Sequence, residues 1–359
     1  MTVSLVVCFL MLSSSVLSLL MTWPRLLKSV LAGAVAVVFI VCVVVPLVFH
    51  YSPRLQRFFL FLNSVSSSIS LNRPEDVGLP GTRNFYLKTD KDVSVGIWHV
   101  LPGSLIHSAP EEPGEWEAWY EGSLKREQPI VLYLHGNKGS RAASHRVELY
   151  NKLRRMEYHV IALDYRGYGD SSSVTVNEEG LVADTKLVFK YLRGKAGNSP
   201  IFVWGHSLGT GVSCHALSEL CQENQCPQGL VLEAAFNNLH DEIELNPLSR
   251  VFHNLPYFEW AFIDPLRDIG NEFKNDVHIT HISCSIMILH AQDDNVVPVE
   301  LGRKLHKAAQ DRRPPAALPV TYIEFEANYG LGHNNIPRAP KFSSIIRTFV
   351  ENSRKGIKS

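Results

Sequence analysis

Apolar and polar positions divide the chain into an N-terminal part and a larger C-terminal part. From residue 130 onward, short apolar runs alternate with longer stretches of helical spacing. Runs that are apolar on both faces are typical of strands buried inside a parallel sheet. The alternation predicts an α/β fold class, with a mostly parallel central sheet and helices on both faces. The predicted strands are Ile130–Leu134, His159–Asp164, Ile201–Trp204, Gly229–Glu233, Ile286–His290 and Tyr322–Phe325, and the predicted helices lie near Glu178–Arg193, Leu208–Leu220 and Lys341–Ser353.

The N-terminal part is far more apolar than the rest. Residues Ser29–Phe49 carry no charge and are numerous enough to cross a bilayer as a helix, so we predict a transmembrane helix there. Residues Val3–Met21 are also apolar but are interrupted by three serines. That stretch is open to three interpretations: a signal peptide, a second span or an interfacial segment. No Lys or Arg precedes it, which disfavours a signal peptide.

Domain boundaries follow from these patterns. Asn84–Leu87 and Val93–Trp98 alternate as an antiparallel strand pair that opens the folded part. We predict an N-terminal hydrophobic segment at 1–28, the transmembrane helix at 29–49, a linker or membrane-proximal segment at 50–83, and one folded domain at 84–359.

Membrane orientation is not decided by charge. Arg25 and Lys28 precede the long apolar run, and Arg54 and Arg57 follow it. If Arg25 and Lys28 are cytosolic, the C-terminal part is lumenal, with one span or with two. If the first segment is instead a cleaved signal, the C-terminal part is cytosolic.

Composition excludes some classes of function. The chain has 359 residues, 45% of them hydrophobic, with 35 basic and 35 acidic side chains, which suits one sizeable domain with appendages and gives no basic excess for nucleic acid. No spacing of Cys and His suggests a metal site, so we predict no metal and no cofactor. Cys221 and Cys226 could bridge in an oxidising lumen.

A candidate nucleophile stands between a predicted strand and a predicted helix. The strand ending at Trp204 runs into Gly205-His206-Ser207-Leu208-Gly209, which has the G-x-S-x-G pattern of a nucleophile elbow. The two glycines remove side chains that would clash in so tight a turn. We therefore predict Ser207 as a nucleophile rather than a simple turn or N-cap residue, with His206 packed around the elbow.

The elbow resembles that of α/β-hydrolases, in which an acid and then a histidine follow the serine along the chain. Asp293 and Asp294 follow the strand Ile286–His290; spacing favours Asp294 as the acid, and Asp293 would cap the turn. His306 lies in a charged helical stretch, whereas His333 lies in a loop beyond the last strand. We predict His333 as the general base.

The loop after the strand Ile130–Leu134 is a candidate oxyanion site. In this fold, that loop supplies one backbone N–H and the residue after the nucleophile supplies the other, which here makes Asn137 and Leu208 the donors. Lys138, Arg141 and Arg146 follow the loop. They are interpreted either as cations for an anionic head group or as the solvated start of a helix.

A long insert separates the strand that ends at Glu233 from the one that starts near Ser285. We predict a cap over Ser207 at about 236–280. Its aromatic residues either line an acyl-chain channel or pack the cap onto the body; they are Phe252, Tyr257, Phe258, Trp260 and Phe262. Residues Phe58–Leu62 are predicted to lie at the membrane surface.

Several motifs together resemble the abhydrolase-domain serine hydrolases, over roughly residues 75–355. They are His135–Asn137, His145–Tyr150, Asp164–Asp170, Trp204–Gly211 and Ile288–Pro298. The resemblance is strongest to members of this family that hydrolyse lysophosphatidylserine and monoacylglycerols.

The resemblance implies an α/β-hydrolase fold and a catalytic triad of Ser207, Asp294 and His333. It also implies lipid ester substrates and an endoplasmic-reticulum membrane protein with a lumenal active site. The chain departs from many relatives by Ala at 291 and 235 and by Asn at 295. Two other hypotheses remain. One is a thioesterase that removes palmitoyl groups from proteins, which a cytosolic active site would favour. The other is a non-catalytic binding protein, which the complete triad disfavours.

Overall fold

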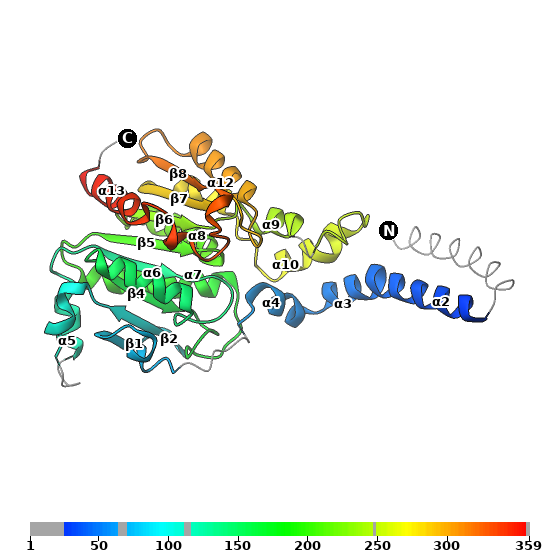
Figure 1. The fold of residues 1–359 in the computed structure, drawn as a ribbon, viewed down its shortest axis with the longest axis horizontal. Helices are drawn as coiled ribbons and strands as arrows, with labels where there is room; N and C mark the ends of the chain where they lie inside the picture. Colours follow the sequence, from blue (N-terminus) through cyan, green and yellow to red (C-terminus); the bar gives the residue numbers. More distant parts are fainter. Residues whose placement is uncertain (1–24, 64–69, 111–115, 247–248, 357–359) are drawn as a thin grey trace.

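An eight-stranded sheet forms the centre of the molecule (Figure 1). The computed structural model describes residues 25–63, 70–110, 116–246 and 249–356. The strand order is β1-β2-β4-β3-β5-β6-β7-β8. β1 pairs antiparallel with β2, β2 pairs antiparallel with β4, and all other neighbours are parallel. The strands are β1 Thr82–Asp90, β2 Val93–Val100, β3 Ile130–Leu134, β4 His159–Asp164, β5 Ile201–His206, β6 Gly229–Glu233, β7 Ser285–Ala291 and β8 Val320–Phe325.

Helices cover both faces of this sheet. Along β3, Ile130 and Leu132 belong to one core cluster, whereas Val131 and Tyr133 belong to another, because successive side chains of a strand point to opposite faces. The first cluster includes side chains of α7, α8 and α12, and the second includes those of α6 and α13. The helix bounds are α5 Trp116–Ser123, α6 Ser144–Arg155, α7 Glu178–Lys195, α8 Leu208–Gln222, α12 Val299–Arg312 and α13 Phe342–Lys355.

The predicted fold class is therefore confirmed. Every residue of β3, β4, β5, β6 and β7 is buried, which is why these strands could be read from apolar runs.

A long apolar helix projects from the body at the N-terminal side (Figure 1). It consists of α2 (Arg25–Phe39), a π-helical turn η1 (Ile40–Val44) and α3 (Val45–Tyr51). An 18-residue window within Leu27–Tyr51 has a mean hydropathy of 3.0 and is almost entirely unburied, so by length and composition this helix could cross a membrane. The predicted span 29–49 lies within this stretch. The prediction for Val3–Met21 falls outside the described residues.

A short helix, α4 (Pro53–Phe61), connects this apolar helix to the body. The side-chain amide of Gln56 donates to the carbonyls of Phe49 (2.8 Å) and His50 (2.9 Å), and the Tyr168 hydroxyl donates to the carbonyl of Phe61 (2.9 Å). Phe61 is fully buried, so α4 is held from both of its ends and is not a free tether.

The insert between β6 and β7 contains α9 (Leu239–Leu245), a π-helical turn η5 (Glu259–Ile263), α10 (Asp264–Asp268) and α11 (Asn275–His278). We call residues 236–280 the cap insert. The aromatic rings of Phe258 and Phe262 are buried in a cluster of their own, which also includes Phe49 of the apolar helix. Of the two interpretations of these aromatic residues, an acyl-chain channel or packing, the contacts seen here therefore favour packing.

Glu178, near the start of α7, holds the returning end of the cap insert. Its carboxylate accepts the backbone N–H groups of Glu272 and Phe273, both at 2.8 Å, and lies 2.7 Å from Nδ1 of His215. The rings of His215 and His278 stack at 4.0 Å. Glu178, His215 and His278 bring metal-ligand atoms close together, but these contacts already give the three side chains a structural role.

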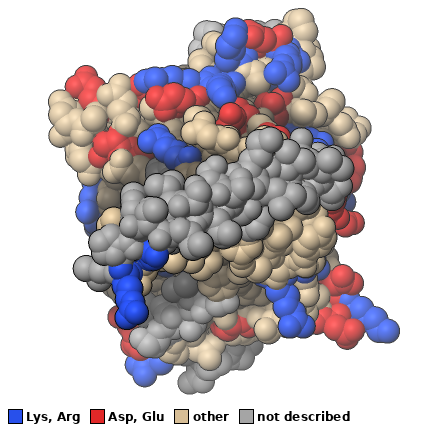
Figure 2. Space-filling model, turned by 90° about the vertical axis from the view of Figure 1, so that its right-hand side faces the viewer, with Lys and Arg blue, Asp and Glu red and all other residues tan. Residues whose placement is uncertain are grey.

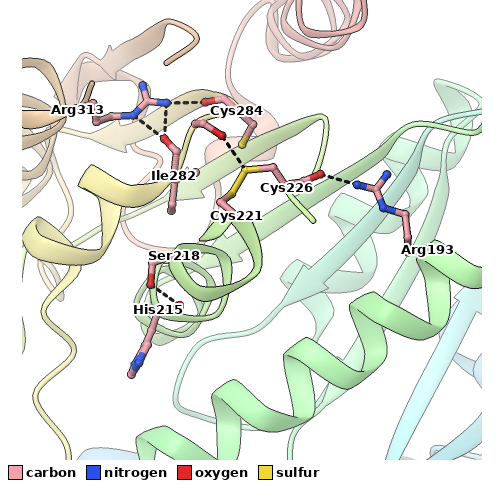
Figure 3. The surroundings of a disulfide bond; sticks show 9 residues. Arg193, His215, Ser218, Cys221, Cys226, Ile282, Cys284 and Arg313 are labelled. Carbon is pink, nitrogen blue, oxygen red and sulfur yellow. Dashed lines mark hydrogen bonds between the residues drawn. A yellow bond between two sulfur atoms is a disulfide. The ribbon is translucent and has the colours of Figure 1, made fainter. Parts of the chain in front are cut away.

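Cys221 and Cys226 form a disulfide (Figure 3). Cys221 lies in the last turn of α8, at the end of this helix opposite Ser207. Arg193 donates to the carbonyl of Cys226 at 2.7 Å and so ties the bridge to α7. The sequence left this pairing open.

Candidate active site

Ser207 stands at the turn from β5 into α8 with φ 53° and ψ −120°. Positive φ is strained for a residue with a side chain and occurs mainly where the surrounding structure enforces it. A Cβ at Gly205 would lie 2.4 Å from the carbonyl oxygen of Gly209, and one at Gly209 would lie 2.0 Å from that of Leu134. Both positions therefore require glycine, which is the physical basis of the G-x-S-x-G spacing.

His333 and Asp294 lie together beyond the ends of β8 and β7. The Nδ1 atom of His333 is 2.8 Å from Oδ2 of Asp294. The other oxygen of this carboxylate, Oδ1, accepts the N–H groups of Val296 (2.8 Å) and Val297 (2.9 Å). The carboxylate is thus fixed in direction and faces the imidazole.

Asp293 has a different contact from its neighbour. Its Oδ2 accepts the backbone N–H of Gly332 at 2.9 Å, one residue before His333. Asp293 therefore holds the backbone of the histidine loop, whereas Asp294 contacts the imidazole itself.

The environment of Asp294 favours the ionised form. Burial raises the pKa of its carboxyl, but hydrogen bonding with His290 and His333 and the charge of His333 outweigh burial, so the pKa lies well below its ordinary value. A carboxylate that stays ionised at neutral pH can orient a neutral imidazole and stabilise the imidazolium.

The histidine loop is bound directly to the elbow. Nε2 of His206 donates to the carbonyl of His333 at 2.9 Å, and the two rings lie 4.9 Å apart. Because His206 precedes Ser207, this bond holds the backbone of His333 beside the elbow. His306, the alternative base, lies in α12 and stacks on Tyr322 at 5.1 Å.

The loop after β3 lies against Ser207. A Cβ at Gly136 would stand 3.1 Å from Cβ of Ser207, so the backbone approaches the elbow as closely as a side-chain-free residue permits. Leu208 is the first residue of α8, and its N–H has no acceptor within the helix. The side chain of Asn137 donates to the carbonyl of Leu60 in α4 at 3.3 Å, which leaves its backbone N–H as the group predicted to bind an oxyanion.

The structure contradicts a head-group role for Arg141 and Arg146. Arg141 is fully buried, with Nη1 2.6 Å from Asp164 and 2.7 Å from Asp170. Arg146 is also buried and donates to the carbonyls of Ser140 and Lys138. Both cations support the loop after β3 from within, and only Lys138 of the three predicted cations is exposed.

Glu233, the last residue of β6, was missed by the sequence analysis. Its carboxylate is buried and accepts the indole N–H of Trp204 at 2.8 Å, and its carbonyl accepts the N–H of Ser207 at 3.0 Å. Burial is the main reason why the pKa of Glu233 rises to about 7; the charge of Asp294 adds to the rise and the bond from Trp204 opposes it. An acidic residue that ends an apolar strand is the signal that could have revealed it.

We expect Glu233→Gln to stabilise the protein in a pH-dependent way. Between pH 4.5 and about pH 7 the unfolded chain loses a proton that the folded carboxyl keeps, so this group lowers the free energy of unfolding as pH rises. The free energy of unfolding is lowered by roughly 3 kcal/mol above pH 7, where the carboxyl is ionised in both the folded and the unfolded chain. Glutamine keeps an acceptor for Trp204 without a charge. Denaturant unfolding should show the variant more stable than wild type at pH 8 and nearly equal at pH 4.5. An identical difference at both pH values would contradict the shift.

Comparisons with known proteins identify relatives of this chain. A family model described as serine aminopeptidase, S33, matches residues 125–261. The chain is 41% identical over 316 residues to the Bos taurus protein named lysophosphatidylserine lipase ABHD12, which covers 88% of this chain and 78% of the relative. It is 39% identical over 312 residues to the Gallus gallus protein of the same name (86% and 81% covered), and 36% identical over 285 residues to the Homo sapiens protein ABHD12B (79% and 76% covered).

Solved structures support the fold. An esterase from Pyrococcus furiosus matches with a TM-score of 0.57 at 18% identity, covering 79% of this chain and 96% of the esterase. An alpha-beta hydrolase from Vibrio vulnificus matches with a TM-score of 0.57 at 18% identity, covering 85% and 94%. At this identity the likeness concerns the fold alone.

Proposed function

The chain belongs to the ABHD12 family of lysophosphatidylserine lipases, and we propose that it cleaves the acyl ester of lysophosphatidylserine and of monoacylglycerols through a covalent acyl-enzyme. It is a carboxylic ester hydrolase with an α/β-hydrolase fold. The observation that carries the mechanism is the contact of His333 with Asp294, on a loop bound to the strained elbow that holds Ser207.

In the proposed reaction, His333 accepts the proton of Ser207 as the hydroxyl attacks the lipid carbonyl. Asp294 stabilises the imidazolium that forms. The imidazolium then protonates the leaving glycerol oxygen, which leaves the fatty acyl group on Ser207. A water molecule, deprotonated by His333, releases the fatty acid in a second round.

The backbone N–H groups of Asn137 and Leu208 are the proposed oxyanion donors. Each such donor typically contributes about 2.7–4 kcal/mol to transition-state stabilisation. Asn137 is held by its side-chain bond to α4 and Leu208 by the start of α8, so neither donor has to reorganise when the charge develops.

Of the two proposed substrates, lysophosphatidylserine carries an anionic head group that would lie near a cation. Lys138 follows the oxyanion loop directly and is exposed, so it is the cation available to a phosphoserine head group. A monoacylglycerol has no such charge, so its binding would depend on its acyl chain alone. No cofactor or metal takes part in the proposed steps.

We propose further that Leu27–Tyr51 anchors the protein in the endoplasmic-reticulum membrane with a lumenal active site. The helix has the length and hydropathy of a span, and the Cys221–Cys226 disulfide suits an oxidising lumen.

Sealed microsomes that contain the protein test these proposals together. We expect lysophosphatidylserine and monoacylglycerol to be hydrolysed, with membranes pretreated with a fluorophosphonate as the blank, and the C-terminal domain to resist added protease until detergent is present. A palmitoyl-cysteine peptide offered in detergent should be cleaved slowly or not at all. Cleavage of the thioester without hydrolysis of either lipid would replace the lipase with the thioesterase hypothesis. Digestion of the domain in sealed microsomes would refute the lumenal orientation.

A further inference from the structure

The apolar helix changes geometry at Pro46. A proline has no N–H, so in a regular α-helix the carbonyl of Cys42, four residues earlier, would lose its donor. Here the helix widens into the π-helical turn Ile40–Val44, with Val45 donating to Ile40. The hydroxyl of Tyr257, from the cap insert, donates to the carbonyl of Cys42. The cap insert therefore supplies a hydrogen-bond donor at the point where the proline removes one.

Two further contacts hold the end of the same helix. The ring of His50 stacks on that of Trp260 at 4.0 Å with 22° between the planes, and Nδ1 of His50 donates to the carbonyl of Trp260 at 2.8 Å. The rings of Phe49 and Phe262 lie 5.2 Å apart. We call the contacts made by Cys42, Phe49 and His50 with the cap insert the clamp.

The position of the clamp agrees with the thickness of a bilayer. The 25 residues of Leu27–Tyr51 would extend about 37 Å, which exceeds a hydrocarbon core of about 30 Å. Counted from the same residue, the part from Leu27 to Cys42 would extend about 24 Å, somewhat less than that thickness. A cap insert bound beyond Cys42 thus leaves most of a span below it.

The surroundings of the helix end suit a lipid surface. Tyr51, Phe58 and Phe59 are 71%, 47% and 56% exposed, and aromatic side chains are favoured at the membrane interface. Figure 2 shows the molecule from the side of this helix, with charged side chains of both signs mainly toward the edge of the view and uncharged residues in the middle. From here α4 leads to the oxyanion loop through the bond between Asn137 and Leu60.

We propose that the clamp fixes the level at which the helix leaves the bilayer, near Cys42, and holds the cap insert on the lipid surface, so that a single-chain lipid passes from the bilayer into the site beside α4. The cap insert and the helix end then move as one rigid body, so the membrane anchor is fixed in its orientation relative to the cap insert. This inference rests on the proposed membrane anchor.

Cysteine labelling tests the level directly. Val35 and Val48 are 43% and 51% exposed and lie on the same helix, on either side of Cys42. Each is replaced by Cys in a chain with Cys8→Ser and Cys42→Ser, which leaves the backbone carbonyl of residue 42 in place. In liposomes with the catalytic domain outward, a membrane-impermeant maleimide should label Val48→Cys and spare Val35→Cys. Protection of both positions would overturn the clamp but keep the anchor. Labelling of both would refute the anchor itself.

Activity gives an independent test. Tyr257→Phe and Trp260→Ala should lower hydrolysis of long-chain lysophosphatidylserine in vesicles several-fold, mainly through KM, while turnover of a soluble short-chain ester in detergent stays within two-fold of wild type. Trp116→Ala removes the same ring from a separate aromatic cluster and should change neither rate. If vesicle activity were unchanged in both cap variants, the proposal would be wrong. It would be equally wrong if hydrolysis of both substrates fell by the same factor and the cap variants at the same time changed from dimer to monomer. The aromatic face would then bind a second copy of the chain.

Discussion

Replacement of Ser207 by Ala is expected to abolish lipid hydrolysis, with a fall in kcat of roughly a million-fold. The hydroxyl is the only proposed group that forms the bond to the acyl carbon, so no neighbouring side chain takes over its role. Labelling by a fluorophosphonate should disappear as well, because the probe reacts with an activated serine. His333→Ala should reduce kcat to a similar extent, since without a base the hydroxyl is not activated.

Ser218→Ala is the matched control. Ser218 is likewise a buried serine and lies within α8, where its hydroxyl donates to the carbonyl of His215 at 2.8 Å. The same deletion of one oxygen there should leave kcat within a few-fold of wild type. If Ser207→Ala kept more than about a hundredth of wild-type activity while remaining folded, Ser207 would not be the nucleophile. A wild-type chain that neither labels nor hydrolyses would support a binding protein on a hydrolase scaffold.

The fold was predictable because burial leaves a simple pattern in the sequence. β3 to β7 are covered on both faces, so each is an apolar run. The tightness of the elbow demands glycine at 205 and 209, so the turn also has a readable spacing. Asp294 could be favoured over Asp293 from spacing, and the structure places Asp294, not Asp293, on His333.

The rest depends on contacts between distant parts of the chain, which leave no local pattern. Arg141 and Arg146 look like solvated cations in the sequence, but Asp164, Asp170 and loop carbonyls compensate for their burial. A lone acidic residue at the end of a strand, such as Glu233, can be exposed to water or buried by other parts of the chain. Only the tertiary packing decides between the two. The bonds of the cap insert to the apolar helix join positions more than 200 residues apart.

Asp294→Asn is expected to lower kcat by roughly ten-thousand-fold without disrupting the fold. Oδ1 of Asp294 accepts two backbone N–H groups, so the amide oxygen of asparagine would take that place. Its NH₂ group would then face Nδ1 of His333, where it can only donate. The imidazole would have to accept at Nδ1 and carry its proton on Nε2, which is the tautomer that cannot accept the proton of Ser207.

Asp293→Asn is the control one residue away. Asparagine can still accept the N–H of Gly332, because one acceptor oxygen suffices for that bond. The loop should keep its position, and kcat should stay within about ten-fold of wild type. Steady-state hydrolysis of lysophosphatidylserine by the two variants, with melting temperatures to confirm folding, separates the roles. A larger loss in Asp293→Asn than in Asp294→Asn would reverse the assignment, because the direction of the imidazole would then depend on the loop backbone more than on the carboxylate that contacts it.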